Sequence, residues 1–215
     1  MELFSLINTS ILETLYMVFF SSIFSTILGM PLGILLVVTS KDHICPHPKL
    51  NMALEGFVNF FRSVPFIILI ILIFPLSRFI VGTTIGSTAA IVPLSIGAAP
   101  FVARIVESSL RELDYGIIEA SIACGASNFQ IIFHVMLRES IPSLILGATI
   151  TIINIIGYSA MAGAVGGGGL GDAAIRYGYQ RFQSDVLFVC VVILVAMVGL
   201  IQLLGNNLST ALNKK

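Results

Sequence analysis

Five long stretches of this 215-residue chain contain no charged side chain, and short polar connectors separate them. The stretches are rich in Ile, Leu, Val and Phe, and they comprise Thr14–Ser40, Ser63–Ser77, Phe79–Ala103, Ser140–Gly171 and Val186–Asn213. A helix needs about 20 apolar residues to cross a bilayer core, and all but the second stretch exceed that length. Because lipid offers the backbone no hydrogen-bond partner, such runs form helices or a closed barrel, and continuous apolar runs exclude the alternating pattern of a barrel. We therefore predict an all-α membrane protein with five transmembrane helices.

These stretches define one transmembrane domain over residues 13–207. The second stretch is short and must borrow residues such as Phe57–Arg62 from upstream. The predicted spans are residues 14–40, 54–77, 79–106, 140–164 and 186–208. Composition agrees, because 57% hydrophobic and 10% charged residues leave no ordinary soluble surface. No Lys or Arg precedes Lys41, so we expect the first span to be retained rather than cleaved as a signal peptide.

Positive charges predict the orientation of the chain. With five spans the termini lie on opposite sides of the membrane, and the side richer in Lys and Arg is expected to be cytoplasmic. A cytoplasmic C-terminus leaves Arg78, Arg176 and Arg181 outside. It places a larger set inside, namely Lys41, Lys49, Arg111, Arg138, Lys214 and Lys215. We predict a multi-pass protein with its N-terminus outside and its C-terminus in the cytoplasm.

The connector over residues 107–139 is the longest polar-containing segment, and its pattern predicts two short helices. Asp114 is placed to cap the first helix and Gly125 to end it. Ser127 and Gln130 have the spacing of a capping box at the start of the second. The predicted apolar face of the second helix consists of Phe129, Ile132, Phe133 and Met136. Two interpretations remain open, a knob that another protein's groove holds and a pair of helices on the lipid surface or packed under the bundle.

A motif in this connector resembles the EAA loop of permease subunits of bacterial ABC importers. Glu119, Ala120 and Ser121 are followed by three residues and then Gly125, as in that loop. Two departures are visible, because Ser121 replaces the second alanine and Arg138 stands where the pattern has proline. We call residues 107–139 the coupling loop.

The resemblance extends over nearly the whole chain, to the permease family of methionine-uptake importers. It includes Phe61–Ile68, Ala90–Leu94, Gly97–Phe101 and Gly157–Met161. It implies a type I ABC importer permease of the bacterial inner membrane that carries L- and D-methionine. The implied partners are a second copy of the chain, two ATP-binding cassette ATPase subunits, an extracytoplasmic methionine-binding protein and membrane lipid, with no nucleic acid. The resemblance also implies that Glu119, Ala120, Ser121 and Gly125 couple the chain to the ATPases.

The sequence gives few indications of which residues line the transport pathway. Arg62 is a basic residue inside a predicted span, where it must snorkel, pair or face a watery cavity, and Pro65 beside it can kink the helix. The fourth span contains Asn154, Tyr158, Ser159 and Met161, which suit passage of a zwitterion with a thioether side chain. The same four residues are equally explained by interhelical hydrogen bonding and packing. All six are candidates for a gate or pathway.

Several other functions are disfavoured. The chain lacks the pattern G-x-x-x-x-G-K-[ST], so we expect ATP and Mg to bind the separate ATPase, and no cofactor, metal or catalytic residue on this chain. The run Gly166–Gly171 contains G-x-G-x-x-G but lacks the strand of a dinucleotide site, so we predict a tight loop at the outer end of the fourth span. A membrane-embedded enzyme would need paired carboxylates, histidines or a Ser/Lys dyad within its spans. A permease for another amino acid and a non-transporting membrane scaffold remain as alternatives.

Overall fold

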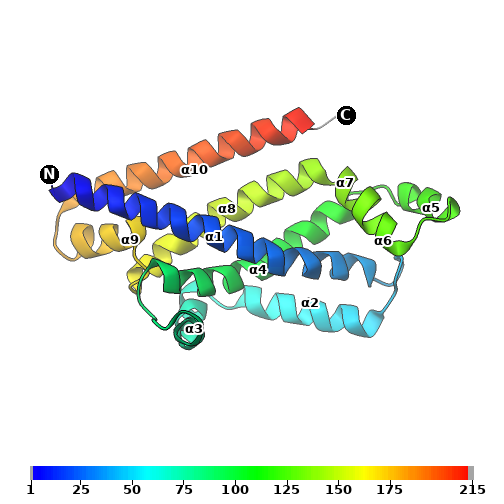
Figure 1. Cartoon of the computed structure of the whole chain (residues 1–215), viewed down its shortest axis with the longest axis horizontal. Coiled ribbons are helices and arrows are strands. Elements are labelled where there is room, and N and C mark those ends of the chain that lie inside the picture. The colour runs from blue at the N-terminus through cyan, green and yellow to red at the C-terminus, as the bar shows by residue number, and fades with distance from the viewer. Residues whose placement is uncertain (1, 213–215) are drawn as a thin grey trace.

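The computed structural model describes residues 2–212, and its long elements are all helices (Figure 1). Within that range, helices long and apolar enough to cross a membrane are α1 (Glu2–Val38), α4 (Ser87–Arg111), α8 (Ile141–Ala164) and α10 (Ser184–Leu212). A fifth crossing exists if α2 (Pro48–Ser63) and α3 (Phe66–Val81) count as one broken span. This architecture agrees with the predicted all-α membrane fold. Lys214 and Lys215, which entered the orientation argument, lie outside the described residues.

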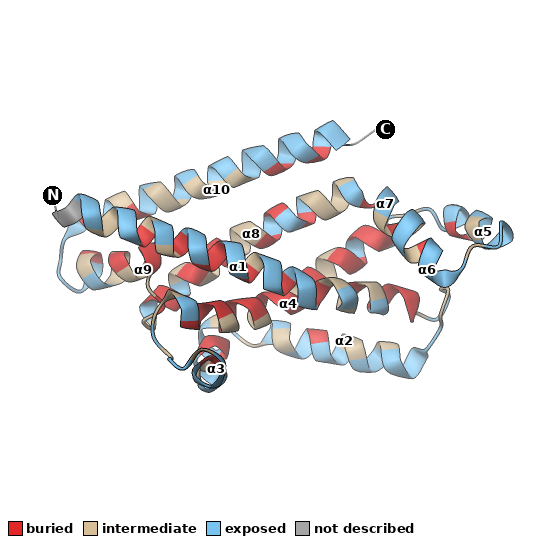
Figure 2. Cartoon of the chain, in the orientation of Figure 1, coloured by how far each residue is buried: buried red, intermediate tan, exposed pale blue. Residues whose placement is uncertain are grey.

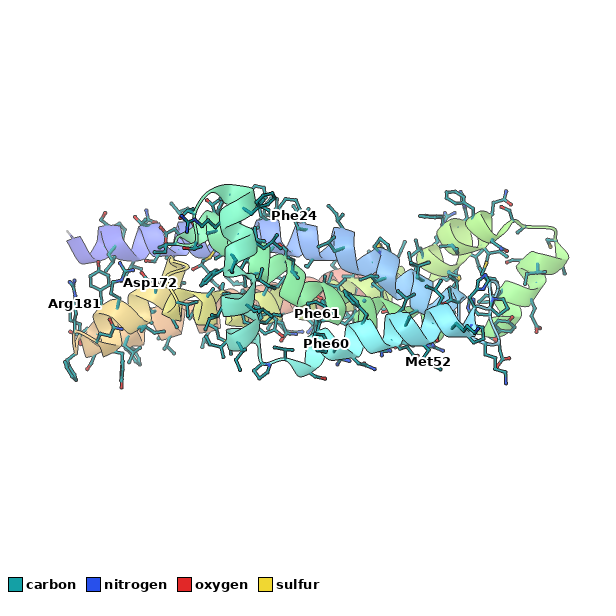
Figure 3. All side chains as sticks on the ribbon, turned by 90° about the horizontal axis from the view of Figure 1, so that it is seen from below. Phe24, Met52, Phe60, Phe61, Asp172 and Arg181 are labelled. Carbon is teal, nitrogen blue, oxygen red and sulfur yellow. The ribbon has the colours of Figure 1, made fainter. Side chains whose placement is uncertain are left out.

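The second predicted span, residues 54–77, is not one continuous helix. α2 and α3 meet at an angle of 106° across Val64 and Pro65. Val64 has ψ 125°, an extended conformation that a following proline favours, and the proline ring supplies no N–H to continue the helix. Pro65 therefore separates two helices, whereas the sequence suggested a kink within one helix. As a result α3 lies crosswise to the other helices (Figures 1 and 3).

The boundaries of the first and third spans also differ from the prediction. The first helix begins at Glu2 instead of residue 14, because an isolated charge at Glu13 does not interrupt helical hydrogen bonding. Residues 79–86, assigned to the start of the third span, instead end α3 and form a turn before α4. Gly82, with φ +86°, ends α3 in the left-handed conformation, and Gly86, with φ +102°, precedes α4; glycine adopts both conformations without strain. The start of α8 agrees with the prediction, with Pro142 in its first turn.

The centre of the bundle is formed by α1, α4 and α8 (Figure 2). α1 and α4 approach closely at two glycines, since a Cβ on Gly29 would lie 2.5 Å from the Ala99 carbonyl oxygen. A Cβ on Gly33 would lie 2.6 Å from the Ala103 carbonyl oxygen. Their spacing of four residues places both glycines on the face of α1 that packs against α4. α10 is largely exposed and strongly apolar, as a lipid-facing helix must be.

Short helices close the two ends of the bundle. At one end the coupling loop contains α5 (Tyr115–Ala123), α6 (Asn128–Gln130), the π-helical turn η1 (Ile131–Met136) and α7 (Leu137–Glu139). At the other end, near the N-terminus, lie α9 (Gly169–Ala173) and the π-helical turn η2 (Ala174–Tyr179) (Figure 1). α4 continues to Arg111, so the connector leaves the bundle a full turn later than residue 107. The coupling loop and the C-terminal end of α10 share one end of the molecule.

Candidate functional site

The coupling loop is anchored under the bundle by buried apolar side chains. Ile118 of α5 is 2% exposed, and Ile131 and Met136 of η1 are fully buried. They form one cluster with the ends of α1 and α4, including Val37 and Leu110. These contacts fix α5 to the ends of α1 and α4.

The opposite face of the coupling loop is exposed. Glu119, Ala120 and Gly125 are exposed, and Ser121 is half-buried with its hydroxyl donating to the Ile117 carbonyl at 2.7 Å. Large apolar side chains lie exposed around them, namely Ile117, Ile122, Phe129 and Phe133. An apolar ridge with a charge beside it, at the end of a bundle, has the character of a surface that another protein covers.

The helix signals in the coupling loop are confirmed. Asp114 caps α5 by accepting a hydrogen bond from the Gly116 N–H at 2.9 Å. Gly125 has φ +79° and donates to the Ile122 carbonyl at 2.9 Å, while the next residue, Ala126, donates to Ser121 at 3.1 Å. This pair of bonds is the Schellman motif that ends a helix at a glycine. The Ser127 and Gln130 capping box is also present.

The predicted apolar face of the second helix is wrong in one respect. Met136 is buried, whereas Phe129 and Phe133 are exposed and stack on each other with ring centroids 4.4 Å apart. The π-helical turn explains the split, because its hydrogen bonds join residues five apart and therefore align Ile131 with Met136. The α-helical spacing assumed from sequence placed all four apolar residues on one side.

A buried carboxylate ties the root of the coupling loop to α2. Glu107 is 6% exposed, and its oxygens accept from Arg104 at 2.5 Å and from Arg111 at 3.1 Å. Arg104 also donates to the Asn59 side chain of α2 at 2.8 Å. Arg104 and Glu107 are three residues apart on α4, a spacing that brings side chains together on a helix.

His43, in the loop between α1 and α2, lies close to the start of α5 and to Arg111 at the end of α4. Its ring is 6.0 Å from the Tyr115 ring at the start of α5. Its Nδ1 atom is buried, and within residues 2–212 it has no hydrogen-bond partner. Burial lowers the pKa of His43 below its ordinary value, and the nearby charge of Arg111 lowers it further.

Four of the six pathway candidates come together around one cavity. Arg62 and Pro65, at the break between α2 and α3, and Tyr158 and Met161 of α8 line a cavity of 450 Å³. The Phe66 ring stacks on Tyr158, with centroids 4.1 Å apart and planes at 11°. The cavity lies at the break at Pro65, where α3 turns across the bundle and the end of α2 and α8 contribute to one lining.

Asn154 and Ser159 do not line this cavity. Ser159 is 2% exposed and donates to the Ile156 carbonyl at 2.8 Å, so it is a packing residue. Asn154 lies one turn before Tyr158 on the same face of α8, nearer the coupling loop. Sequence reasoning missed Phe66 and Phe101 as cavity-lining residues, and their only signal was adjacency to Pro65 and Pro100.

Residues 166–168 of the glycine run form the predicted loop, at the end of the bundle opposite the coupling loop, whereas Gly169–Gly171 belong to α9. The Gly169 N–H donates to the Glu13 carboxylate at 2.7 Å, and the Leu170 N–H donates to Thr14 at 2.9 Å. Asp172 of α9 pairs with Arg176 at 3.0 Å. Burial raises the pKa of Asp172, Arg176 opposes that change, and Glu13 adds to it. The backbone amides of Gly169 and Leu170 bond to α1, so this segment is a structural connection between α9 and α1.

Comparison with known proteins identifies the family of the chain. Residues 29–215 match the model of the binding-protein-dependent transport system inner membrane component family. The chain belongs to this family. The match includes the coupling loop and every residue that lines the cavity beside Pro65, whereas Glu13 and Thr14 precede the matched residues.

Individual relatives of this inner membrane component are similar over nearly their full length. A probable D-methionine transport system permease protein of Pasteurella multocida is 48% identical over 97% of this chain and 96% of the relative. A methionine import system permease protein of Bacillus subtilis is 46% identical over 94% of this chain and 91% of the relative. An inward-facing crystal form of the MetNI methionine ABC transporter superposes with a TM-score of 0.96 at 47% identity, covering 97% of each chain.

Proposed function

We propose that this chain is the membrane-spanning permease subunit of a bacterial ABC importer that carries L- and D-methionine across the inner membrane. The observation that carries the proposal is the coupling loop, with Ile118 and Met136 buried in the bundle and Glu119 and Ala120 exposed on its outer face. Such an arrangement holds a partner outside the membrane while remaining rigidly joined to the spans. The methionine permeases among its relatives support methionine as the substrate.

In this proposal two copies of the chain enclose the pathway, and two ATPase subunits bind their coupling loops. One chain with five crossings encloses little space, so a two-fold pair is the economical arrangement. Glu119 supplies a charge at the rim of the ATPase groove, and Ala120 lets α5 approach its floor. Gly125 ends α5 sharply so that the two helices of the loop fit one groove. ATP and Mg bind the ATPase, and this chain performs no catalysis.

The proposed orientation has the N-terminus outside and the coupling loop in the cytoplasm. Lys41, Lys49, Arg111 and Arg138 all belong to the end of the bundle that carries the coupling loop, which favours that end as the cytoplasmic one (Figure 1). The glycine loop and α9 then face the extracytoplasmic binding protein. Closure of the ATPases moves the docked coupling loops, and the spans alternate between inward and outward openings.

A cellular uptake assay tests the proposal. A methionine auxotroph without its own methionine importers receives this chain with its ATPase and its binding protein, and growth on low L- or D-methionine is measured. Growth that fails when any one component is omitted supports the proposal. Growth on another amino acid instead of methionine would keep the permease and change its substrate, and a complex that never forms would exclude the ATPase-coupled function.

A further inference from the structure

We propose that the cavity between α2, α3, α4 and α8 is a binding station for the substrate within the membrane, at which Arg62 pairs with the substrate's carboxylate. The aromatic and thioether side chains around it hold the substrate's apolar side chain. This inference rests on the proposed function and names the chemistry by which the same chain recognises its cargo. Besides Arg62 and Met161, the lining includes Phe61, Phe66, Gly97, Phe101 and Tyr158.

The size of the cavity fits a small zwitterion. Its volume is 450 Å³, which falls within the range of about 300–1,000 Å³ typical of small-molecule sites. Its walls come from four helices that are distant in sequence, and the break at Pro65 brings them together. Ligand sites in helical membrane proteins commonly lie where a broken helix interrupts the bundle.

The position of Arg62 is unfavourable without an anion. About 21 Å of helical rise separates it from the start of α2 at Pro48, and its exposed side chain lines the cavity. Within residues 2–212 its guanidinium has no ion pair, and no carboxylate lines the cavity beside it. A guanidinium at membrane depth is costly unless it is paired or hydrated, and its planar fork binds carboxylates with two parallel hydrogen bonds.

The rest of the cavity suits an uncharged, polarizable side chain. Phe61, Phe101 and Met161 offer apolar surfaces, and sulfur packs favourably against aromatic rings. The substrate's ammonium group meets aromatic faces rather than an acid, which attract a cation moderately. A substrate with a second positive charge finds no partner there and is disfavoured.

Packing fixes the Phe66 ring in the wall of the cavity. Phe66 is stacked on Tyr158 at 4.1 Å, and a Cβ on Gly97 would lie 2.8 Å from the Phe66 ring. The ring is therefore fixed between α4 and α8. Because α3 begins at Phe66, any change in the angle between α2 and α3 moves this ring and changes the shape of the cavity.

Saturation-transfer NMR on the permease–ATPase complex in nanodiscs, without the binding protein, tests the inference. Titrations compare methionine with methioninamide, which retains the thioether and the amine but lacks the carboxylate. Wild-type complex is expected to bind methionine roughly 10- to 100-fold more tightly than methioninamide, as for charge-assisted hydrogen bonds. Arg62→Gln is expected to remove that preference and Arg62→Lys to retain part of it. Arg78→Gln, an exposed arginine of α3 outside the cavity, is the matched control and should bind as wild type does.

Two results would overturn the inference about the cavity and leave the proposed function intact. One is an Arg62→Gln complex that still binds its ATPase and still prefers methionine over methioninamide. The other is a wild-type complex that gives no methionine signal although the complete importer takes up methionine. Absence of both signal and uptake would instead overturn the proposed function itself.

Discussion

Arg104 near the end of α4 donates a hydrogen bond of 2.8 Å to Asn59 of α2, and this contact joins the helix above the coupling loop to the helix that carries Arg62. At its other end α2 is attached to α1, because the Asn51 amide donates to the Leu36 carbonyl at 2.7 Å, and Val58 is its only buried residue within the described chain. A movement of α5 is therefore expected to reach the break at Pro65 through α4, Arg104 and α2.

Removing the Asn59 amide should weaken this transmission. Asn59→Ala is expected to lower methionine uptake several-fold while ATP hydrolysis by the complex continues, because α2 no longer follows α4. Asn59→Gln, which keeps an amide, should recover part of the uptake. The ratio of methionine transported to ATP hydrolysed checks the prediction, and an unchanged ratio for Asn59→Ala would exclude the path.

Gly125→Pro should uncouple the importer. Gly125 has φ +79°, which proline cannot adopt, and its N–H bonds to Ile122 in the Schellman motif. The end of α5 is then remodelled, and we expect uptake to be lost while the protein stays in the membrane. Glu119→Lys should have the same effect by reversing the charge at the groove rim. Normal uptake with both variants would contradict the role of the coupling loop.

The exposed apolar ridge should contribute to binding of the ATPase. Phe129 and Phe133 are 64% and 49% exposed, and each loses contact with water when a partner covers the loop. Replacing either by Ser is expected to weaken the permease–ATPase affinity by roughly tenfold, in line with the burial of an aromatic side chain. Phe188→Ser, on the exposed face of α10, is the control and should leave the affinity unchanged. Co-purification at graded ATPase concentrations measures the effect.

Two glycines of α8 should respond differently to alanine. A Cβ on Gly163 would lie 2.2 Å from the Asp172 backbone nitrogen, whereas nothing lies within 4 Å of a Cβ on Gly157. Gly163→Ala is expected to lower the free energy of unfolding by about 1–3 kcal/mol through overpacking against α9. Gly157→Ala should be neutral or slightly stabilising, because alanine favours helix. Thermal unfolding in detergent compares the two variants, and equal midpoints would refute the close packing.

Acidification should loosen the junction at His43. Its pKa is lowered below 6.5 by burial and by Arg111, so the unfolded chain binds a proton more readily than the folded one. The stability that the neutral ring contributes is therefore present above this value and declines as the pH falls through it. The difference in unfolding midpoint between about pH 7.5 and about pH 5.5 should shrink in His43→Leu, and an equal difference in both proteins would contradict the lowered pKa.

Local signals in the sequence predicted local structure well. Asp114, Gly125 and the Ser127–Gln130 pair act through backbone groups within a few residues, so their caps follow from spacing alone. The four long apolar helices α1, α4, α8 and α10 follow from apolar length, which lipid makes decisive.

Features that depend on contacts distant in sequence were not predictable in the same way. Pro65 signals a kink, but the 106° angle depends on how α3 packs against α4 and α8. The π-helical turn η1 changed which residues of the coupling loop face inward. The cavity combines residues from four helices, so Phe66 and Phe101 had no pattern that marked them beforehand.

Methionine uptake into proteoliposomes that contain this chain and its ATPase, with the binding protein and labelled methionine on one side and ATP on the ATPase side, tests the central claim most directly. The account predicts uptake that requires ATP and the binding protein, that unlabelled L- and D-methionine compete away, and that Gly125→Pro abolishes. A complex that hydrolyses ATP and binds the binding protein but never accumulates methionine, or accumulates it equally with Gly125→Pro, would contradict it.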